Sequence, residues 1–245
     1  MRTLYQFEVS HYCEKARWAL DAKGLDYRVK NLLPGAHRRS LARLAPRTSV
    51  PVLVDGGEVV QGSAEIITWL DRHHAHPALT PVGAEERALA LEWERNADRN
   101  LGVPLRAVFF AAVLDDRALS TRLLTAHGPW WGGAWYALAF PAVRRGLRRG
   151  LNLNESNVAA ARARLEQSFT AAEQRLAGRR YLAGPLFSRA DLAWCALLSP
   201  ALFPPAALPA QLQAFIDAQR ERPLFEWARG IYAEHRARRQ EAGEK

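Results

Sequence analysis

Two short segments place a serine where an extended run meets a helical run. Ser10–Cys13 follows an alternating apolar run that reads as a strand, and Ser63 follows Gln61 and Gly62 at the start of a second helical run. Amides at a helix N-terminus have no intrahelical partner, and the helix dipole there favours negative charge. Either segment could therefore bind an anion. Serine is also a preferred helix cap, so a purely structural role stays open for both.

The cysteines limit the redox chemistry that the chain can perform. Cys13 would be reactive if the helix N-terminus lowered its pKa, but a small buried hydrophobic side chain is the commoner role of a lone cysteine. Because position 10 is serine, no dithiol motif forms with Cys13. Cys195, in a different sequence context, is the only other cysteine. This argues against a disulfide framework and favours a reducing compartment, which we take to be the cytoplasm, and we expect no metal site.

A proline at the start of a strand marks a third segment of interest, Ser49–Val52. A cis peptide bond before Pro51 would turn the chain sharply and leave the Val50 N–H and C=O facing outward. An extended peptide could then pair with the Val50 backbone as an added strand. An ordinary trans proline that opens an edge strand is equally consistent with the spacing.

The elements that would position these segments alternate between strand and helix in the first third of the chain. The expected order is β-α-β-α-β-β-α, with strands over 3–9, 27–32, 50–54 and 58–61 and helices over 12–23, over 38–44 and from 63 onward. The first two strands need a parallel crossover, whereas the Asp55-Gly56-Gly57 turn makes the last two antiparallel. A mixed four-stranded sheet covered by helices follows. After a proline-containing linker over 72–81, the patterns are helical.

Composition excludes several classes of protein. The 245 residues are 49% hydrophobic and 24% charged, which is typical of a soluble globular protein with a sizeable core. The formal net charge of +9 is densest at Arg144–Arg149 and Arg236–Arg239, but there is no nucleic-acid motif, and we expect no nucleic-acid partner. Glycines and prolines interrupt the uncharged stretches 123–143 and 192–216, so neither is expected to span a membrane.

The sequence resembles the glutathione transferases over nearly its whole length. Four segments carry this resemblance through their order and spacing: Ser10–Arg17, Ser49–Pro51, Gly62–Ile66 and Tyr181–Asp191. The resemblance implies an α/β thioredoxin-like, glutathione-binding domain over residues 1–78 and an all-α, substrate-binding domain over residues 84–245. Within the last segment, Ser188 and Asp191 look like a capping box, in which each side chain satisfies the other's backbone donor.

The resemblance also implies roles for individual residues, with glutathione as the co-substrate. Ser10 stands at the catalytic position, the Val50 backbone before a cis Pro51 pairs with the cysteinyl part of glutathione, and Ser63 with the neighbouring Gly62 holds the γ-glutamyl carboxylate. The glycyl end is assigned to His37, Arg38 or Arg47.

Two positions depart from the family pattern. Gly62 stands where many relatives carry an acidic residue or glutamine, so the γ-glutamyl amine needs Glu65, Gln61 or a second subunit. His11 replaces a proline, and we expect its side chain to face solvent.

The function predicted from the resemblance is attack by the glutathione thiolate on a small hydrophobic electrophile, a detoxification reaction of a cytoplasmic homodimer. Aromatic residues between Phe109 and Tyr136 could line the electrophile's pocket or simply pack in the core or at an interface. Three alternatives stay open. These are a glutathione-dependent thiol reductase or lyase using Cys13 or Cys195, a non-enzymatic binding protein, and a membrane-surface protein using Trp130–Phe140 and the arginines that follow.

Overall fold

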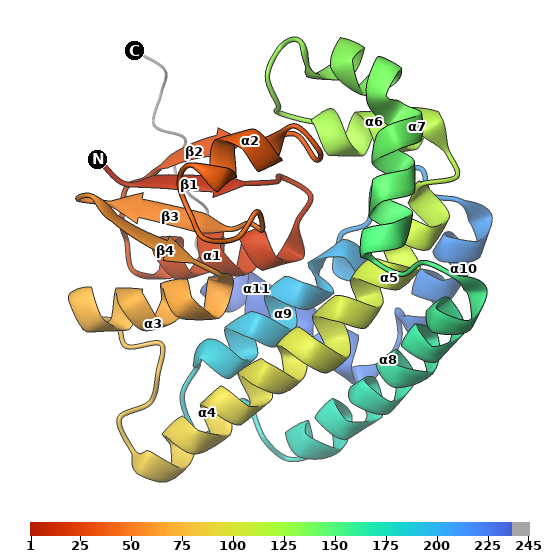
Figure 1. Ribbon diagram of the computed structural model, residues 1–245. Coiled ribbons are helices and arrows are strands. Elements are labelled where there is room, and N and C mark those ends of the chain that lie inside the picture. The colour runs from red at the N-terminus through yellow and green to blue at the C-terminus, as the bar shows by residue number, and fades with distance from the viewer. Residues whose placement is uncertain (237–245) are drawn as a thin grey trace.

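The computed structural model describes residues 1–236, and their first third is built around a four-stranded mixed sheet (Figure 1). The strand order is β2-β1-β3-β4, in which β1 and β2 are parallel and the other two pairs are antiparallel. The elements of this part are β1 (Thr3–Gln6), α1 (His11–Ala22), β2 (Arg28–Asn31), α2 (His37–Ala42), β3 (Val52–Asp55), β4 (Glu58–Gln61) and α3 (Ser63–His73). Their order and directions confirm the predicted fold class.

The strands are shorter than the sequence patterns predicted, and the residues that they leave out matter for the site. β1 ends at Gln6, because the chain then turns and the Ser10 N–H donates to the Phe7 carbonyl at 3.1 Å. β3 begins at Val52, so Val50 lies outside the hydrogen-bonded ladder. The residues that these two strands leave out lie at one edge of the sheet, where β1 ends and β3 begins.

Helix α1 begins and ends for identifiable local reasons. The Ser10 Oγ accepts the Cys13 N–H at 3.4 Å, which caps the helix. At the other end Gly24 adopts a φ of +64°, a conformation that favours glycine, and its N–H donates to the Asp21 carbonyl. Helices α1 and α3 cover one face of the sheet, and α2 covers the opposite face (Figure 1).

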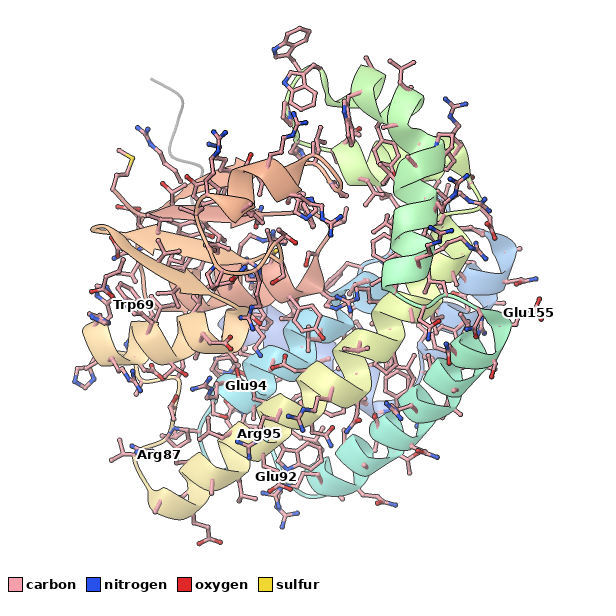
Figure 2. The ribbon with its side chains drawn as sticks, in the orientation of Figure 1. Trp69, Arg87, Glu92, Glu94, Arg95 and Glu155 are labelled. Atoms are coloured by element: carbon pink, nitrogen blue, oxygen red, sulfur yellow. The ribbon has the colours of Figure 1, made fainter. Side chains whose placement is uncertain are left out.

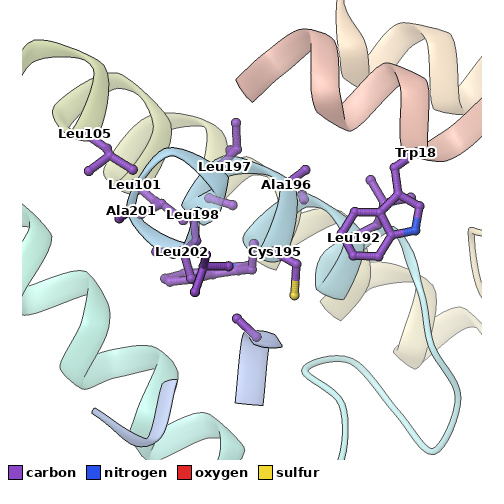
Figure 3. Close-up of a cluster of buried hydrophobic side chains, with 14 of the residues drawn as sticks. Trp18, Leu101, Leu105, Leu192, Cys195, Ala196, Leu197, Leu198, Ala201 and Leu202 are labelled. Carbon is purple, nitrogen blue, oxygen red and sulfur yellow. The ribbon is translucent and has the colours of Figure 1, made fainter. Parts of the chain in front are cut away.

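The remaining described residues are helical, as predicted. The elements are α4 (Ala84–Asn96), a π-helical turn η1 (Ala97–Gly102), α5 (Val103–Val113), α6 (Arg117–Thr125), α7 (Gly132–Gly150), α8 (Glu155–Leu176), α9 (Arg189–Leu202), α10 (Ala210–Gln219) and α11 (Pro223–His235). Nearly all α9 side chains are buried. Figure 3 shows them among neighbours from other elements, including Trp18 of α1, Leu101 of η1 and Leu105 of α5. The main core therefore continues from the sheet-bearing part into the helical part.

Helices α6 and α7 form a hairpin with a small core of its own. Leu124, Tyr136 and Val143 are buried together there, separately from the main core. The hairpin also reaches the loop between β2 and α2, where a Cβ added to Gly35 would lie 3.1 Å from the ring of Trp135. The hairpin thus closes over the end of the sheet at which α1 begins.

No helix within residues 1–236 is long and apolar enough to cross a membrane. The basic run at the C-terminal end is described only in part. Arg236 belongs to the described residues, whereas Arg238 and Arg239 lie outside them.

The predicted capping box at the start of α9 is present. The Asp191 Oδ2 accepts the Ser188 N–H at 2.9 Å, and the Ser188 Oγ accepts the Ala190 N–H at 3.3 Å. Asp191 does more than complete the box, because its Oδ1 also accepts the buried Leu182 N–H at 2.7 Å. The carboxylate thereby fixes the loop that leads into α9.

Replacing the two residues of the box should have unequal effects on stability. Ser188→Ala removes the cap bond and the bond that the hydroxyl donates to the Asp191 Oδ2 at 3.0 Å, and should lower the free energy of unfolding by about 1 to 2 kcal/mol. Asp191→Ala leaves two buried amides without an acceptor and should cost about 2 to 4 kcal/mol. Urea unfolding of both variants measures the difference, and equal losses would contradict this assignment.

Candidate functional site

A cavity of about 680 Å³ lies between the sheet-bearing part and the helical part. Its volume is within the range of small-molecule binding sites. The loop before α1, the start of α1, the start of α2 and residues 48–50 form one wall, and α5, α6, α7, α9 and α11 contribute to the rest. Four of the predicted site residues line it: Ser10, His37, Arg38 and Val50.

Ser10 is half-buried in this wall at the N-cap of α1. Its Oγ uses a lone pair to accept the Cys13 N–H. The hydroxyl is also within hydrogen-bonding reach of the Cys13 thiol, but burial raises the pKa of that thiol and a neutral thiol is a weak acceptor, so the hydrogen can be donated instead to a stronger acceptor in the cavity. Cap and donor are compatible roles of one hydroxyl, so the two interpretations of Ser10 do not exclude each other.

Both cysteines are fully buried. Burial raises the pKa of the Cys13 thiol, and a hydrogen bond from Ser10 and the charge of Arg17 oppose this only in part. Burial likewise raises the pKa of Cys195. Neither cysteine lines the cavity, so the structure offers no feature that favours a thiol mechanism at these residues.

The expectation that His11 faces solvent is wrong. His11, the first residue of α1, lines the cavity but is only 5% exposed. It packs beside Tyr12 and against the helical part near Gly102 and Arg106. Burial and the nearby charge of Arg106 lower its pKa to about 3, so the imidazole is neutral. Its Nε2 is buried and has no hydrogen-bond partner within residues 1–236.

The loop before β3 has the conformation that the resemblance implied. The Val50–Pro51 peptide bond is cis. Neither the N–H nor the C=O of Val50 bonds to another backbone group of the described residues. The buried Gln61 side chain holds this loop, because its Nε2 donates to the carbonyls of Arg47 at 2.6 Å and Ser49 at 2.8 Å. Gln61 is thus fully engaged and is not available to a ligand.

Ser63 and Gly62 lie at the same sheet edge, where Gln61 of β4 pairs with Val52 of β3. Ser63 is the first residue of α3, and Gly62 precedes it with a φ of +109°. The carboxylate of Glu65 folds back over Gly62 and takes the space that a side chain there would occupy. Ser63, Gly62 and Pro51 do not line the cavity, and Ser63 and Pro51 are buried at this sheet edge.

His37 and two arginines lie near the expected glycyl end. His37 begins α2, and its ring meets the Phe7 ring edge-on with centroids 4.8 Å apart. Partial burial lowers its pKa. Arg38 lines the cavity and is exposed, whereas the guanidinium of Arg47 donates to the Gln61 carbonyl at 3.3 Å. His37 and Arg38 are therefore adjacent to the site, and Arg47 is partly used by the loop.

Some of the aromatic residues between Phe109 and Tyr136 line the cavity, and others pack in a core or are exposed. Phe109 and Phe110 line the cavity. Tyr136 is fully buried in the small core of the α6–α7 hairpin, and Trp130 is 96% exposed. Sequence reasoning missed Arg106 of α5 and Tyr232 of α11, which also line the cavity. No local pattern marks either residue, because both reach the site from distant helices.

A buried group of charged side chains behind the cavity was also missed. The Glu94 carboxylate lies between Lys15 and Arg189, at 2.9 Å from the Lys15 Nζ and 2.6 Å from the Arg189 Nε. Lys15 also binds Asp98 at 2.8 Å. Figure 2 shows Glu94 on α4, beside the sheet-bearing part. The group joins α1 to α4, η1 and α9 and so fixes the two sides of the cavity relative to each other.

Comparison with known proteins identifies the first part of the chain. Residues 4–78 match the family model for the glutathione S-transferase N-terminal domain. Glutathione S-transferase Z2 of Arabidopsis thaliana is 38% identical over 89 residues, which are 35% of this chain and 40% of that protein. The match thus spans less than half of the relative's length.

Solved structures resemble the chain over most of its length. A theta class glutathione S-transferase from Xanthomonas axonopodis pv. citri, with glutathione bound, has a TM-score of 0.61 at 23% identity, covering 92% of this chain and 95% of its own. A beta-etherase from Sphingobium sp. strain SYK-6 has a TM-score of 0.64 at 20% identity, covering 94% and 98%. At these identities the likeness establishes the fold.

The buried neutral His11 should make the protein sensitive to acid. The folded pKa of about 3 lies below the ordinary 6.5, so the unfolded state binds the proton first and stability is lost as the pH falls below 6.5. Between about pH 6.5 and pH 5, His11→Gln should lose roughly 2 kcal/mol less free energy of unfolding than the wild type. Urea unfolding at both pH values measures this, with His73→Gln as an exposed control. Equal losses in wild type and His11→Gln would show that His11 is not the group responsible.

Proposed function

We propose that this chain is a member of the glutathione S-transferase family, whose N-terminal domain model matches residues 4–78, and that it is an enzyme that binds glutathione and activates its thiol as a thiolate. Residues 1–78 are the glutathione-binding domain in this proposal, and residues 84–245 are the substrate-binding domain. The observation that carries it is the Ser10 hydroxyl, which caps α1, faces the cavity and has a hydrogen to donate.

The local electrostatics are sufficient to ionise a bound thiol. A free thiol has a pKa of about 8.5, and lowering it by about 2 units takes roughly 2.7 kcal/mol. A hydrogen bond from Ser10 to the thiolate contributes about 1.5 to 3 kcal/mol, and the N-terminus of α1 contributes about 0.3 to 1 kcal/mol. Together these terms match the requirement.

The reaction is a nucleophilic displacement. The thiol proton leaves to solvent, and the thiolate sulfur forms a bond to the electrophilic carbon of the acceptor. With an aryl halide, the carbon–halogen bond breaks and halide departs with the bonding electron pair. Ser10 contributes by holding the sulfur as an anion beside the start of α1, and the electrophile occupies the cavity against Phe109 and Phe110.

The sheet edge suits an extended tripeptide. The unused N–H and C=O of Val50 can pair with the cysteinyl residue of glutathione, with Pro51 fixing the turn. Ser63, at the first turn of α3 beside Gly62, can bind the γ-glutamyl carboxylate. The glycyl carboxylate would then extend toward His37 and Arg38.

Glu65 is the candidate partner of the γ-glutamyl amine. Gln61 is occupied by the loop before β3, and Gly62 has no side chain. The Glu65 carboxylate lies over Gly62, in the position that a side chain of residue 62 would otherwise fill. It is exposed there, so its charge is available to an ammonium group. We therefore assign to Glu65 the role that the family pattern gives to position 62.

The proposal also specifies that the second substrate is a small hydrophobic electrophile, that the reaction serves detoxification, and that the protein is a cytoplasmic homodimer. The apolar residues of the cavity support the first of these. The two unpaired cysteines are consistent with a reducing compartment.

The role of Ser10 can be tested on bound glutathione. Ser10→Ala should raise the pKa of the bound thiol by about 1 to 2 units, because the donor of one charge-assisted hydrogen bond is lost. Ultraviolet absorbance of the thiolate measures this pKa, and conjugation of 1-chloro-2,4-dinitrobenzene should fall about 10-fold or more at neutral pH. Glutathione binding should be retained. Ser40→Ala, on the exposed side of α2, is the matched control, and an unchanged thiol pKa with unchanged turnover would exclude the assigned role.

The KM for glutathione tests the role of Glu65, whereas the pKa of the bound thiol tests the role of Ser10. Glu65→Gln removes the charge that binds the γ-glutamyl amine and should raise the KM for glutathione about 10-fold. The pKa of the bound thiol should not change, because the thiol is on the cysteinyl residue of glutathione, away from the γ-glutamyl amine that Glu65 binds. Glu85→Gln, at the exposed start of α4, is the control. A KM that stays at the wild-type value would assign the amine to another group.

A further inference from the structure

The helical wall of the cavity contains a cation without a counter-ion. Arg106 of α5 is half-buried and lines the cavity, and its Nε is buried without a hydrogen-bond partner within residues 1–236. No ion pair of Arg106 with another described residue is present either. Its guanidinium carbon lies 5.8 Å from the centre of the Tyr12 ring, which places it near the start of α1.

The other charged residues of the cavity are in a different situation. Arg17 donates to Glu14 at 2.9 Å and to Gln6 at 2.5 Å, so its guanidinium is satisfied within the protein. Glu14 is also paired with Arg236 at 2.8 Å. Arg38 is exposed and hydrated. Arg106 thus differs from the other two arginines of the lining, because its Nε is buried and it has no hydrogen-bond or ion-pair partner among the described residues.

A second unpartnered nitrogen lies close to Arg106. The charge of Arg106 acts on His11, whose Nε2 is buried and unbonded within the described residues. The neutral His11 ring donates its one N–H to the Gly102 carbonyl, so its Nε2 is an acceptor and the donors available to an anion are those of Arg106. The unpaired buried Nε–H of Arg106 costs free energy that a bound ligand can recover. A guanidinium matches the geometry of a carboxylate, which can accept two parallel N–H bonds from it. The chemistry of this wall therefore selects an anion, and a planar carboxylate in particular.

The surroundings of Arg106 limit the rest of the ligand. The adjacent cavity surface is apolar and partly aromatic, formed on α5 by Leu105, Phe109, Phe110 and Val113. A ligand that fits both features has a hydrophobic, preferably aromatic body and one negative charge. We propose, building on the proposed transferase function, that the electrophile carries a carboxylate and that Arg106 binds this group and so determines specificity.

Two other roles of Arg106 are distinguishable from this one. If Arg106 bound a carboxylate of glutathione, its removal would raise the KM for glutathione. If Arg106 stabilised the thiolate, its removal would raise the pKa of the bound thiol. The assignment to the electrophile predicts that neither quantity changes.

The test compares two acceptors that share a reacting carbon and differ in charge, 4-chloro-3-nitrobenzoate and 4-chloro-3-nitrobenzamide. Arg106→Gln should lower kcat/KM for the benzoate about 10- to 100-fold, because a charge-assisted pair is lost, and should leave the benzamide within about threefold. Arg106→Lys should restore part of the activity with the benzoate. Arg145→Gln, on the exposed surface of α7 and outside this cavity, should behave as the wild type.

A binding measurement keeps this inference separate from the transferase proposal. Calorimetric titration with 4-nitrobenzoate and 4-nitrobenzamide, which lack the leaving group, needs no turnover. Wild type should bind the benzoate more tightly, and Arg106→Gln should abolish the preference. Equal effects of Arg106→Gln on both compounds, a higher KM for glutathione or a raised thiol pKa would overturn the inference. If the wild type transfers glutathione to neither acceptor, the transferase proposal fails, and the two titrations still decide whether Arg106 binds a carboxylate.

Discussion

The buried carboxylate of Glu94 is the interaction on which the geometry of the cavity depends. It lies between the cations of Lys15 and Arg189, and Arg189 also donates to the Ala64 carbonyl of α3 at 2.9 Å. A buried charge is tolerated only when it is paired and hydrogen-bonded, so these side chains cannot separate without a large cost. The sheet-bearing part, which carries Ser10, is thereby held in one position against the helices that carry Arg106.

The connection continues through the π-helical turn η1. Tyr12, two residues after Ser10, donates its hydroxyl to the Asp98 carbonyl of η1 at 2.7 Å. The close approach requires glycine at position 102, because a Cβ there would lie 2.5 Å from the Tyr12 oxygen. A turn of π-helix often marks a functional site, and here it lies between the residues that anchor α1 and the residues of α5 that line the cavity.

Much of the fold could be predicted from local patterns, whereas only part of the site could. The directions of the β1–β2 and β3–β4 pairs, the Ser10 cap, Gly24 at the end of α1 and the Ser188 box depend on residues close together in sequence, so the sequence reveals them. The pairing of β1 with β3, which joins Thr3 to Val54, is long-range and was not predicted. The burial of His11 and the position of Arg106 depend on contacts between α1 and α5, which no local pattern encodes. Glu65 took the place of a side chain at position 62 because a helical turn brings its carboxylate back over the glycine. The sequence offered Glu65 only as one of three candidates to compensate for Gly62, and the structure places its carboxylate over that glycine.

The hairpin of α6 and α7 is stabilised mainly by its own few apolar side chains, of which Leu124, Tyr136 and Val143 are the buried centre. It contributes Leu123, Leu124 and Leu147 to the cavity, and its contact with the continuous core around α9 is made by Leu119 and Leu123 of α6. Mutations of its cavity-lining residues can therefore reshape the helical wall of the cavity without changing the wall formed by the loop before α1 and residues 48–50. Under the proposed function, a new acceptor preference can therefore arise from changes in this hairpin while Ser10 and the start of α1 stay unchanged.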